Sequence, residues 1–182
     1  MDTPRTLVVL YSRTGTTKIV GTKISEMLHC DVEELVDRRR RTGLVGYLRS
    51  SLDATLRRRT RLAPTSFNPA EYDLVIIGTP VWNASVSAPV RTYLAENYGR
   101  MRRIAFFCTH GGKWSERALA QMERICRKKP VTTLVLRTAE VSRGGIDAKI
   151  RTFVETARAA QTAIPSAPEP PRGIATPGAQ PA

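Results

Sequence analysis

Hydroxyl-bearing residues and a glycine cluster near the start of the chain, between an apolar run and a helical pattern. The segment reads Ser12-Arg13-Thr14-Gly15-Thr16-Thr17. Backbone N–H groups at a helix amino terminus, together with the helix dipole and hydroxyl donors, bind phosphate without a lysine. The segment matches neither G-x-G-x-x-G nor G-x-x-x-x-G-K-S/T, which argues against dinucleotide and nucleoside-triphosphate sites. A phosphate site and a simple helix start capped by Ser or Thr are the two alternatives.

Two further segments place aromatic, glycine and polar residues directly after apolar runs. They are Gly78-Thr79-Pro80-Val81-Trp82-Asn83-Ala84-Ser85 and Cys108-Thr109-His110-Gly111-Gly112-Lys113-Trp114. An indole at a strand end can stack on a planar ligand, and paired glycines let the backbone approach a ligand closely. Taken singly, Trp82 is equally consistent with a core aromatic, the two glycines with a tight turn and His110 with a surface histidine. The conjunction of all three segments favours a ligand site.

Short apolar runs alternate with longer amphipathic patterns, which is typical of a parallel sheet with helices on both faces. We expect strands at Thr6–Tyr11, Asp31–Val36, Leu74–Gly78, Ile104–Thr109 and Thr132–Arg137. We expect helices at Thr16–Leu28, Val86–Tyr98, Trp114–Arg127 and Ile146–Thr162, with Pro89 in a first-turn position. In open α/β sheets ligands bind at the carboxyl ends of the strands, so the three segments should meet there.

A basic stretch, Asp37 to Ala63, separates the second and third expected strands. Its arginines are Arg38–Arg41, Arg49, Arg57–Arg59 and Arg61. Leucines recur at every fourth position from Leu44 to Leu56, which predicts an amphipathic helix with its apolar face on the sheet. We expect the arginines of the Arg38–Arg61 stretch to attract an acidic partner or an anionic surface. A nucleic-acid function is disfavoured because the stretch is poor in aromatic residues for base stacking.

The composition, 41% hydrophobic and 25% charged, is that of a globular protein with a formal charge of +13. No apolar run approaches the roughly 20 residues that a bilayer requires. The run Leu7–Leu10 is too short for a signal-peptide core, so a cytoplasmic location is expected. Cys30, Cys108 and Cys126 are odd in number and form no C-x-x-C, which favours reduced thiols and no metal site.

The length of 182 residues fits one sizeable core. We expect one ordered domain over residues 1–163. The segment 164–182 is rich in Pro, Ala, Gly and Ser, and this composition predicts a disordered tail.

The motifs resemble the short-chain flavodoxin family and its flavodoxin-like oxidoreductase relatives. The phosphate-loop pattern S/T-x-T-G-x-T matches Ser12, Thr14, Gly15 and Thr17. Thr79–Asn83 and Thr109–Gly112 fall where the family has its two isoalloxazine loops. The segment YDLVIIGTPVWNASVSAPVRTYL is also similar to members in which G-S/T-P-x-W precedes PVR. The resemblance covers residues 6–159.

This resemblance implies a three-layer α/β/α sandwich with a five-stranded parallel sheet in the order 2-1-3-4-5. It further implies non-covalent FMN held by the three loops, and electron transfer through the flavin. Three features depart from the family pattern. The chain is strongly basic, Arg13 lies inside the phosphate loop, and the usual tyrosine after the fourth strand is missing, which leaves Trp82 and Trp114 as stacking candidates.

Two functional hypotheses follow from the resemblance. The first is an electron carrier that acts between protein partners. The second is an FMN-dependent oxidoreductase, either an NAD(P)H-dependent quinone reductase or an enzyme similar to the flavodoxin-like protoporphyrinogen oxidases. The flavin supplies the redox chemistry in both, so neither requires a catalytic side chain, and His110 is the one candidate proton donor near the site.

Overall fold

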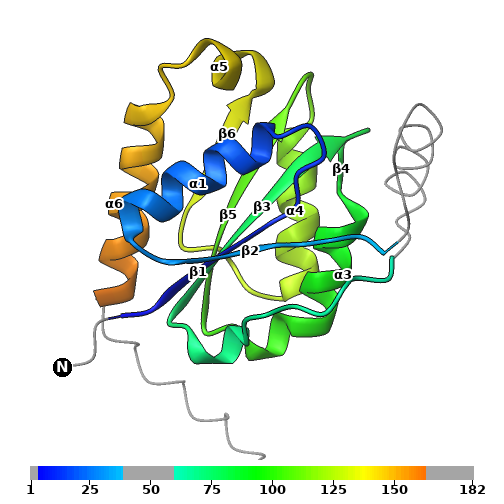
Figure 1. The fold of residues 1–182 in the computed structure, drawn as a ribbon, viewed down its shortest axis with the longest axis vertical. Helices are drawn as coiled ribbons and strands as arrows, with labels where there is room; N and C mark the ends of the chain where they lie inside the picture. Colours follow the sequence, from blue (N-terminus) through cyan, green and yellow to red (C-terminus); the bar gives the residue numbers. More distant parts are fainter. Residues whose placement is uncertain (1–3, 39–59, 163–182) are drawn as a thin grey trace, which may run out of the picture.

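The computed structural model describes residues 4–38 and 60–162. Five parallel strands lie in the order β2-β1-β3-β5-β6 (Figure 1). Their bounds are β1 (Thr6–Leu10), β2 (Asp31–Glu34), β3 (Leu74–Trp82), β5 (Arg103–His110) and β6 (Thr133–Arg137). A two-residue strand, β4 (Ser85–Val86), pairs antiparallel with the end of β3. Counted along the parallel strands, this is the predicted order 2-1-3-4-5, which is confirmed.

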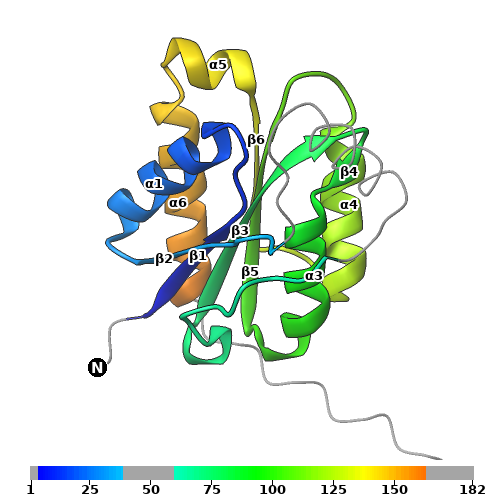
Figure 2. The same cartoon turned by 45° about the vertical axis from the view of Figure 1, so that its right-hand side comes forward.

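Helices cover both faces of the sheet, as the alternating pattern predicts (Figure 2). On one face lie α1 (Thr16–Leu28), α5 (Thr138–Arg143) and α6 (Asp147–Thr162), and on the other lie α3 (Ala88–Asn97) and α4 (Ser115–Cys126). Two 3₁₀ turns, η1 (Pro69–Glu71) and η2 (Tyr98–Arg100), precede β3 and β5. Within the described residues, no helix has the length and apolarity needed to cross a bilayer.

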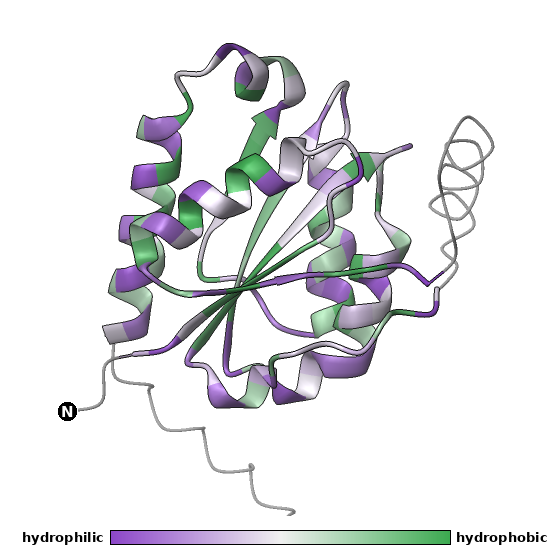
Figure 3. Ribbon diagram, in the orientation of Figure 1, coloured by the Kyte–Doolittle hydropathy of each residue, from purple (hydrophilic) through white to green (hydrophobic). Residues whose placement is uncertain are grey.

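Alternate side chains of the strands build one hydrophobic core on each face, which Figure 3 shows as apolar strands between helices with polar outer surfaces. In β1, Val8 and Leu10 pack towards α1 and α6, whereas Leu7 and Val9 pack towards α3 and α4. All four of these side chains are at most 1% exposed. A strand buried on both faces is expected at the centre of a parallel sheet, and it fixes the position of the loop that follows β1.

Most predicted elements are found with ends shifted by one or two residues, and Pro89 does lie in the first turn of α3. The largest error concerns β3, which was predicted to end at Gly78 but continues to Trp82. It then turns back into β4, so a segment predicted as a loop is a hairpin. The short helix α5 was not predicted.

Two predictions fall largely or wholly outside the described residues. The leucine-patterned helix lies within 39–59, and the predicted tail is 164–182. The flanks of the basic stretch are described, and they meet at an antiparallel bridge between Asp37 and Leu62.

Candidate functional site

The carboxyl ends of β1, β3, β5 and β6 meet around a cavity of about 320 Å³. Eleven of the fifteen predicted site residues line it. They are Thr14, Thr16, Thr17, Pro80, Val81, Trp82, Asn83, Thr109, His110, Gly111 and Gly112. The three sequence segments therefore converge as the rule for open α/β sheets requires. The other four, Ser12, Arg13, Gly15 and Thr79, belong to the same segments but are not among the lining residues.

The loop between β1 and α1 leaves a helix amino terminus without a side-chain cap. The N-cap residue is Gly15, with φ +89°, and no side chain accepts a hydrogen bond there. The alternative of a Ser or Thr N-cap is therefore wrong. The Oγ of Ser12 is buried and has no hydrogen-bond partner among the described residues. A buried hydroxyl and several first-turn N–H groups thus lack side-chain acceptors, which is the donor set that a phosphate requires.

One hydrogen bond ties the first loop to the third. Thr17, which is 1% exposed, places its Oγ1 2.8 Å from Oγ1 of Thr109. Both residues line the cavity. The contact spans 92 positions of sequence and fixes the start of α1 against the end of β5.

The second segment enters the site as a β-hairpin. Trp82 pairs with Ser85 across a two-residue turn in which Asn83 has φ +47° and Ala84 has φ +58°. Positive φ at both positions is the signature of a type I′ turn, whose twist matches that of the flanking strands. Asn83 tolerates this conformation, but Ala84 adopts it at a steric cost.

Trp82 is half-buried and lines the cavity. Its ring makes an edge-on contact with Tyr11, with centroids 6.1 Å apart and planes at 90°. Trp82 was predicted either to stack on a ligand or to belong to the core. In the structure it packs against the core and also lines the cavity. Thr79 has a different role: it is fully buried, and its Oγ1 accepts a hydrogen bond from the Ser87 N–H (3.2 Å) at the start of α3.

Two polar residues, one on α4 and one on α3, form hydrogen bonds with the hairpin. Gln121 of α4 donates from Nε2 to the Ala84 carbonyl (3.3 Å), and its Oε1 accepts from the Ser85 hydroxyl (2.9 Å). Arg91 of α3 is 6% exposed and donates from one nitrogen to the Ser85 Oγ (2.8 Å) and the Val86 carbonyl (3.0 Å). Sequence reasoning missed both residues. The available signal was an arginine within the apolar segment PVRTYL, where a buried charge requires hydrogen bonds.

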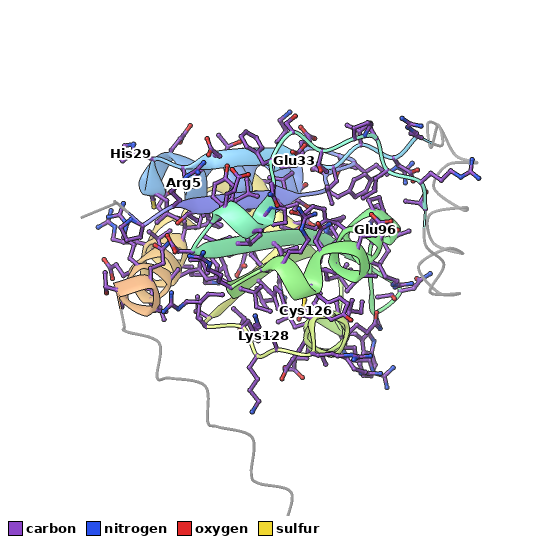
Figure 4. The ribbon with its side chains drawn as sticks, turned by 90° about the horizontal axis from the view of Figure 1, so that it is seen from below. Arg5, His29, Glu33, Glu96, Cys126 and Lys128 are labelled. Carbon is purple, nitrogen blue, oxygen red and sulfur yellow. The ribbon has the colours of Figure 1, made fainter. Side chains whose placement is uncertain are left out.

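The third segment ends β5 with His110, which is 8% exposed and therefore not a surface histidine. Its Nδ1 lies 2.7 Å from the Gly112 carbonyl oxygen. A carbonyl only accepts, so Nδ1 carries the proton and Nε2 is left for other partners. The second histidine of the chain, His29, is the C-cap of α1 and is exposed (Figure 4), whereas the cavity lies at the amino end of that helix.

The two tryptophans differ in their position relative to the cavity. Trp114 does not line it: its side chain is 58% exposed, and the Arg117 guanidinium lies 4.7 Å from its ring centroid. Trp82 is thus the tryptophan placed for contact with a ligand. Two glycines follow His110 in the third loop, and a Cβ built on Gly111 or Gly112 meets nothing within 4 Å. The surrounding protein atoms leave room for a side chain at both positions, whereas a ligand that approaches the backbone closely would require glycine.

One lining residue, Thr138, was not predicted. It follows β6 and begins α5. The rule that places ligands at strand ends applies equally to the fifth parallel strand, so this residue could have been included.

The cysteines fit the sequence prediction of free thiols. Cys108 and Cys126 are buried, and burial raises the pKa of each thiol to about 12. Cys30 is half-buried with its pKa raised to about 12, by burial first and then by Asp31. Within residues 4–38 and 60–162, no group of three or more His, Cys, Asp or Glu side chains is arranged to hold a metal ion.

A doubly wound sheet with its cavity at the strand ends defines the class of α/β proteins that bind ligands at this edge. The sequence matches the family described as Flavodoxin over residues 5–157, and the chain belongs to that family. The resemblance predicted from the motifs is confirmed. A search of curated proteins found no match.

Solved structures share this fold. A flavoprotein in complex with FMN from Lactobacillus acidophilus NCFM is 23% identical with a TM-score of 0.60, covering 78% of this chain and 98% of its own. A protein of Bacteroides eggerthii DSM 20697 classed with the flavoproteins is 17% identical with a TM-score of 0.67, covering 86% and 99%. Two-electron reduced flavodoxin of Megasphaera elsdenii is 14% identical with a TM-score of 0.53, covering 85% and 98%. The flavodoxin-like α/β/α fold is confirmed.

Proposed function

We propose that this protein binds one FMN non-covalently in the cavity at the strand ends and functions in electron transfer. The observation that carries the proposal is the donor set beside α1. The Ser12 hydroxyl is buried without a partner among the described residues, next to a helix amino terminus that no side chain caps. A dianionic phosphate supplies several acceptor oxygens and interacts favourably with the helix dipole. Family membership and an FMN-bound structural relative support the same ligand.

The hairpin and the third loop are proposed to hold the isoalloxazine ring. Trp82 offers an aromatic surface, and Pro80, Val81 and Asn83 extend the same wall. Gly111 and Gly112 have no side chains, so backbone groups of this loop other than the Gly112 carbonyl, which accepts from His110, can approach the polar edge of the ring. FMN, when bound, accepts and donates electrons through this ring.

The side chains of the site act by positioning. Gln121 and Arg91 hold the hairpin, and the hydrogen bond from His110 to the Gly112 carbonyl holds the third loop. His110 Nδ1 is occupied in this contact, so any proton that the residue holds for a substrate is held at Nε2. We assign no nucleophile or general base to the site.

The test of the phosphate assignment uses Ser12→Ala and Thr14→Ala, with Thr22→Ala on α1 as the control. Each site variant should weaken FMN more than riboflavin, because riboflavin lacks the phosphate. Thr22 is exposed on the same helix, and its replacement should leave both affinities unchanged. Equal losses for FMN and riboflavin would remove the phosphate from this loop.

The stacking assignment is tested by tryptophan fluorescence. Added FMN should quench the emission, and Trp82→Phe should remove most of the quenching. Trp114→Phe is the matched control, because Trp114 is exposed and does not line the cavity. If Trp114→Phe removes the quenching instead, the third loop supplies the stacking face.

A carrier and an enzyme differ in their response to small donors. Members of this family transfer electrons to redox partners. We propose that the partner of this basic chain is acidic, and that the protein works in a reducing, cytoplasmic compartment, which its free cysteines support. Bleaching of the flavin absorbance by NADPH or NADH alone in stopped flow would favour the quinone-reductase or protoporphyrinogen-oxidase-like alternative. No bleaching with either, but rapid reduction through a reductase protein, would favour the carrier.

A further inference from the structure

A second cavity, of about 450 Å³, lies between α3 and the chain that leads into η1. Its lining includes Arg38, Thr60, Arg61, Tyr93, Glu96 and Asn97. None of its lining residues lines the cavity at the strand ends. It therefore needs an explanation apart from the FMN site.

Two arginines stand opposite each other at this cavity. The Asp37–Leu62 bridge is antiparallel, and the Arg38 N–H donates to the Arg61 carbonyl at 3.0 Å. Arg38 and Arg61 are thus cross-strand neighbours on one side, and like charges in this arrangement destabilise the pair. Both are exposed, and neither guanidinium forms an ion pair with a carboxylate of the described residues. An anion between them would relieve the repulsion.

The backbone beside the arginines is held in place. The Thr60 N–H donates to Thr92 Oγ1 of α3 at 2.9 Å, and the Thr60 hydroxyl donates to Asp37 Oδ1 at 2.6 Å. Thr60 is 7% exposed, although the following residue, Arg61, is exposed. The backbone that carries the two arginines is therefore attached to α3 and does not need to form on binding.

A buried hydroxyl belongs to a residue that lines the same cavity. Tyr93 lines the cavity and is 1% exposed, and its hydroxyl has no hydrogen-bond partner among the described residues. The nearby Glu33 carboxylate is engaged elsewhere, because its Oε2 accepts from the N–H groups of Ser66 (2.6 Å) and Phe67 (3.1 Å). Burial, with a smaller contribution from Glu33, raises the pKa of Tyr93, so the phenol is a neutral donor. Leaving such a buried donor unpaired is unfavourable, and an acceptor on a ligand would satisfy it.

We propose that this cavity is a second ligand site, which binds a small organic anion through a carboxylate or phosphate group. The anionic group lies between Arg38 and Arg61, and an acceptor on the same molecule takes the Tyr93 hydroxyl. Glu96, labelled on α3 in Figure 4, also lines the cavity and repels further negative charge. The ligand is therefore compact, with its charge at one end.

The experiment uses the full chain at saturating FMN, so that the first cavity is blocked. Inorganic phosphate and malonate are titrated at constant ionic strength against chloride, and binding is followed by the amide resonances of Thr60, Arg61 and Tyr93. At least one of the two anions should give saturable shifts. Preference for one probe identifies phosphate or carboxylate as the group bound. Shifts that chloride reproduces, or the absence of saturation with both probes, would overturn the proposal.

Variants separate the site from general charge effects. Arg38→Gln with Arg61→Gln should weaken binding about tenfold or more, as expected for the loss of charge-assisted hydrogen bonds. Arg124→Gln with Arg151→Gln removes the same charge from exposed positions on α4 and α6 and should change nothing. Equal loss in both pairs would refute a defined site.

Tyr93→Phe provides a test with a separate readout. Without the anion, its denaturation midpoint should equal or exceed that of the parent, because the lost hydroxyl has no protein partner. Its anion affinity should fall. A lower midpoint together with unchanged affinity would show that the hydroxyl serves the fold and not a ligand.

Discussion

The contact between Gly78 and Phe107 gives a quantitative prediction about the centre of the sheet. The two residues are register partners on β3 and β5, and the Phe107 ring occupies the space where Gly78 lacks a side chain. A Cβ at position 78 would lie 2.0 Å from Phe107 Cζ and 2.4 Å from Cε1. Carbon atoms pack at about 3.5–4.0 Å, so the ring must move by more than 1 Å.

Gly78→Ala should therefore destabilise the protein by about 1–3 kcal/mol, the usual cost of overpacking a core. Phe107 is fully buried, so the ring has no solvent-exposed position to move into. Phe107→Leu alone should cost about 1–2 kcal/mol through lost volume. The double variant should be more stable than the sum of the two losses predicts, because the smaller side chain removes the clash. We expect a coupling energy of about 1 kcal/mol or more.

The assay is equilibrium urea unfolding of the parent, both single variants and the double variant, followed by circular dichroism. The control pair is Gly99→Ala with Phe107→Leu, since a Cβ on Gly99 meets nothing within 4 Å. That pair should be additive. Additive losses for Gly78→Ala and Phe107→Leu would refute the steric argument, as would a Gly78→Ala variant with parental stability.

Three further outcomes are expected. Ala84→Gly should raise the free energy of unfolding by about 1 kcal/mol, because glycine adopts φ +58° without strain; a lower thermal midpoint would contradict the turn assignment. Gln121→Ala should weaken FMN and riboflavin equally, since it loosens the hairpin and not the phosphate loop, whereas a loss confined to FMN would contradict this role. Burial raises the pKa of the Cys108 and Cys126 thiols from about 9 in the unfolded chain to about 12 in the fold. Their contribution to stability is therefore full below pH 9 and is lost as the pH rises towards 12. Replacing both cysteines by alanine should make the urea midpoint fall less steeply over this pH range.

The pattern of the sequence predicts the parallel strands and the meeting of the three segments, because both depend on features that run along the chain. The strand order itself is implied by the resemblance to the flavodoxin family. Buried parallel strands have apolar runs of recognisable length, and right-handed crossovers restrict how such runs can be arranged. The phosphate loop is similarly local. Ser12 and Gly15 lie within four residues of each other, so their proximity needs no tertiary information.

The hairpin could not be predicted in the same way. Asn83 favours a turn, but Ala84 stands where a type I′ turn commonly has glycine, so the local sequence does not identify a two-residue hairpin. The conformation instead depends on distant partners. Gln121 lies 37 positions from Ala84 along the chain, and it reaches the turn only because α4 packs beside β4.

The position of Ala84 links this hairpin to the proposed function. Alanine at positive φ is unfavourable in isolation, and the structure compensates with hydrogen bonds from Gln121 to the Ala84 carbonyl and from Arg91 to the strand that follows the turn. The turn is therefore held by side chains of α3 and α4, while Trp82 and Asn83 line the cavity. A hairpin held in this way keeps its conformation when the ligand is absent, which reduces the entropic cost of ordering it on binding. On this argument the affinity for the flavin ring depends on α3 and α4, neither of which contributes a residue to the cavity lining.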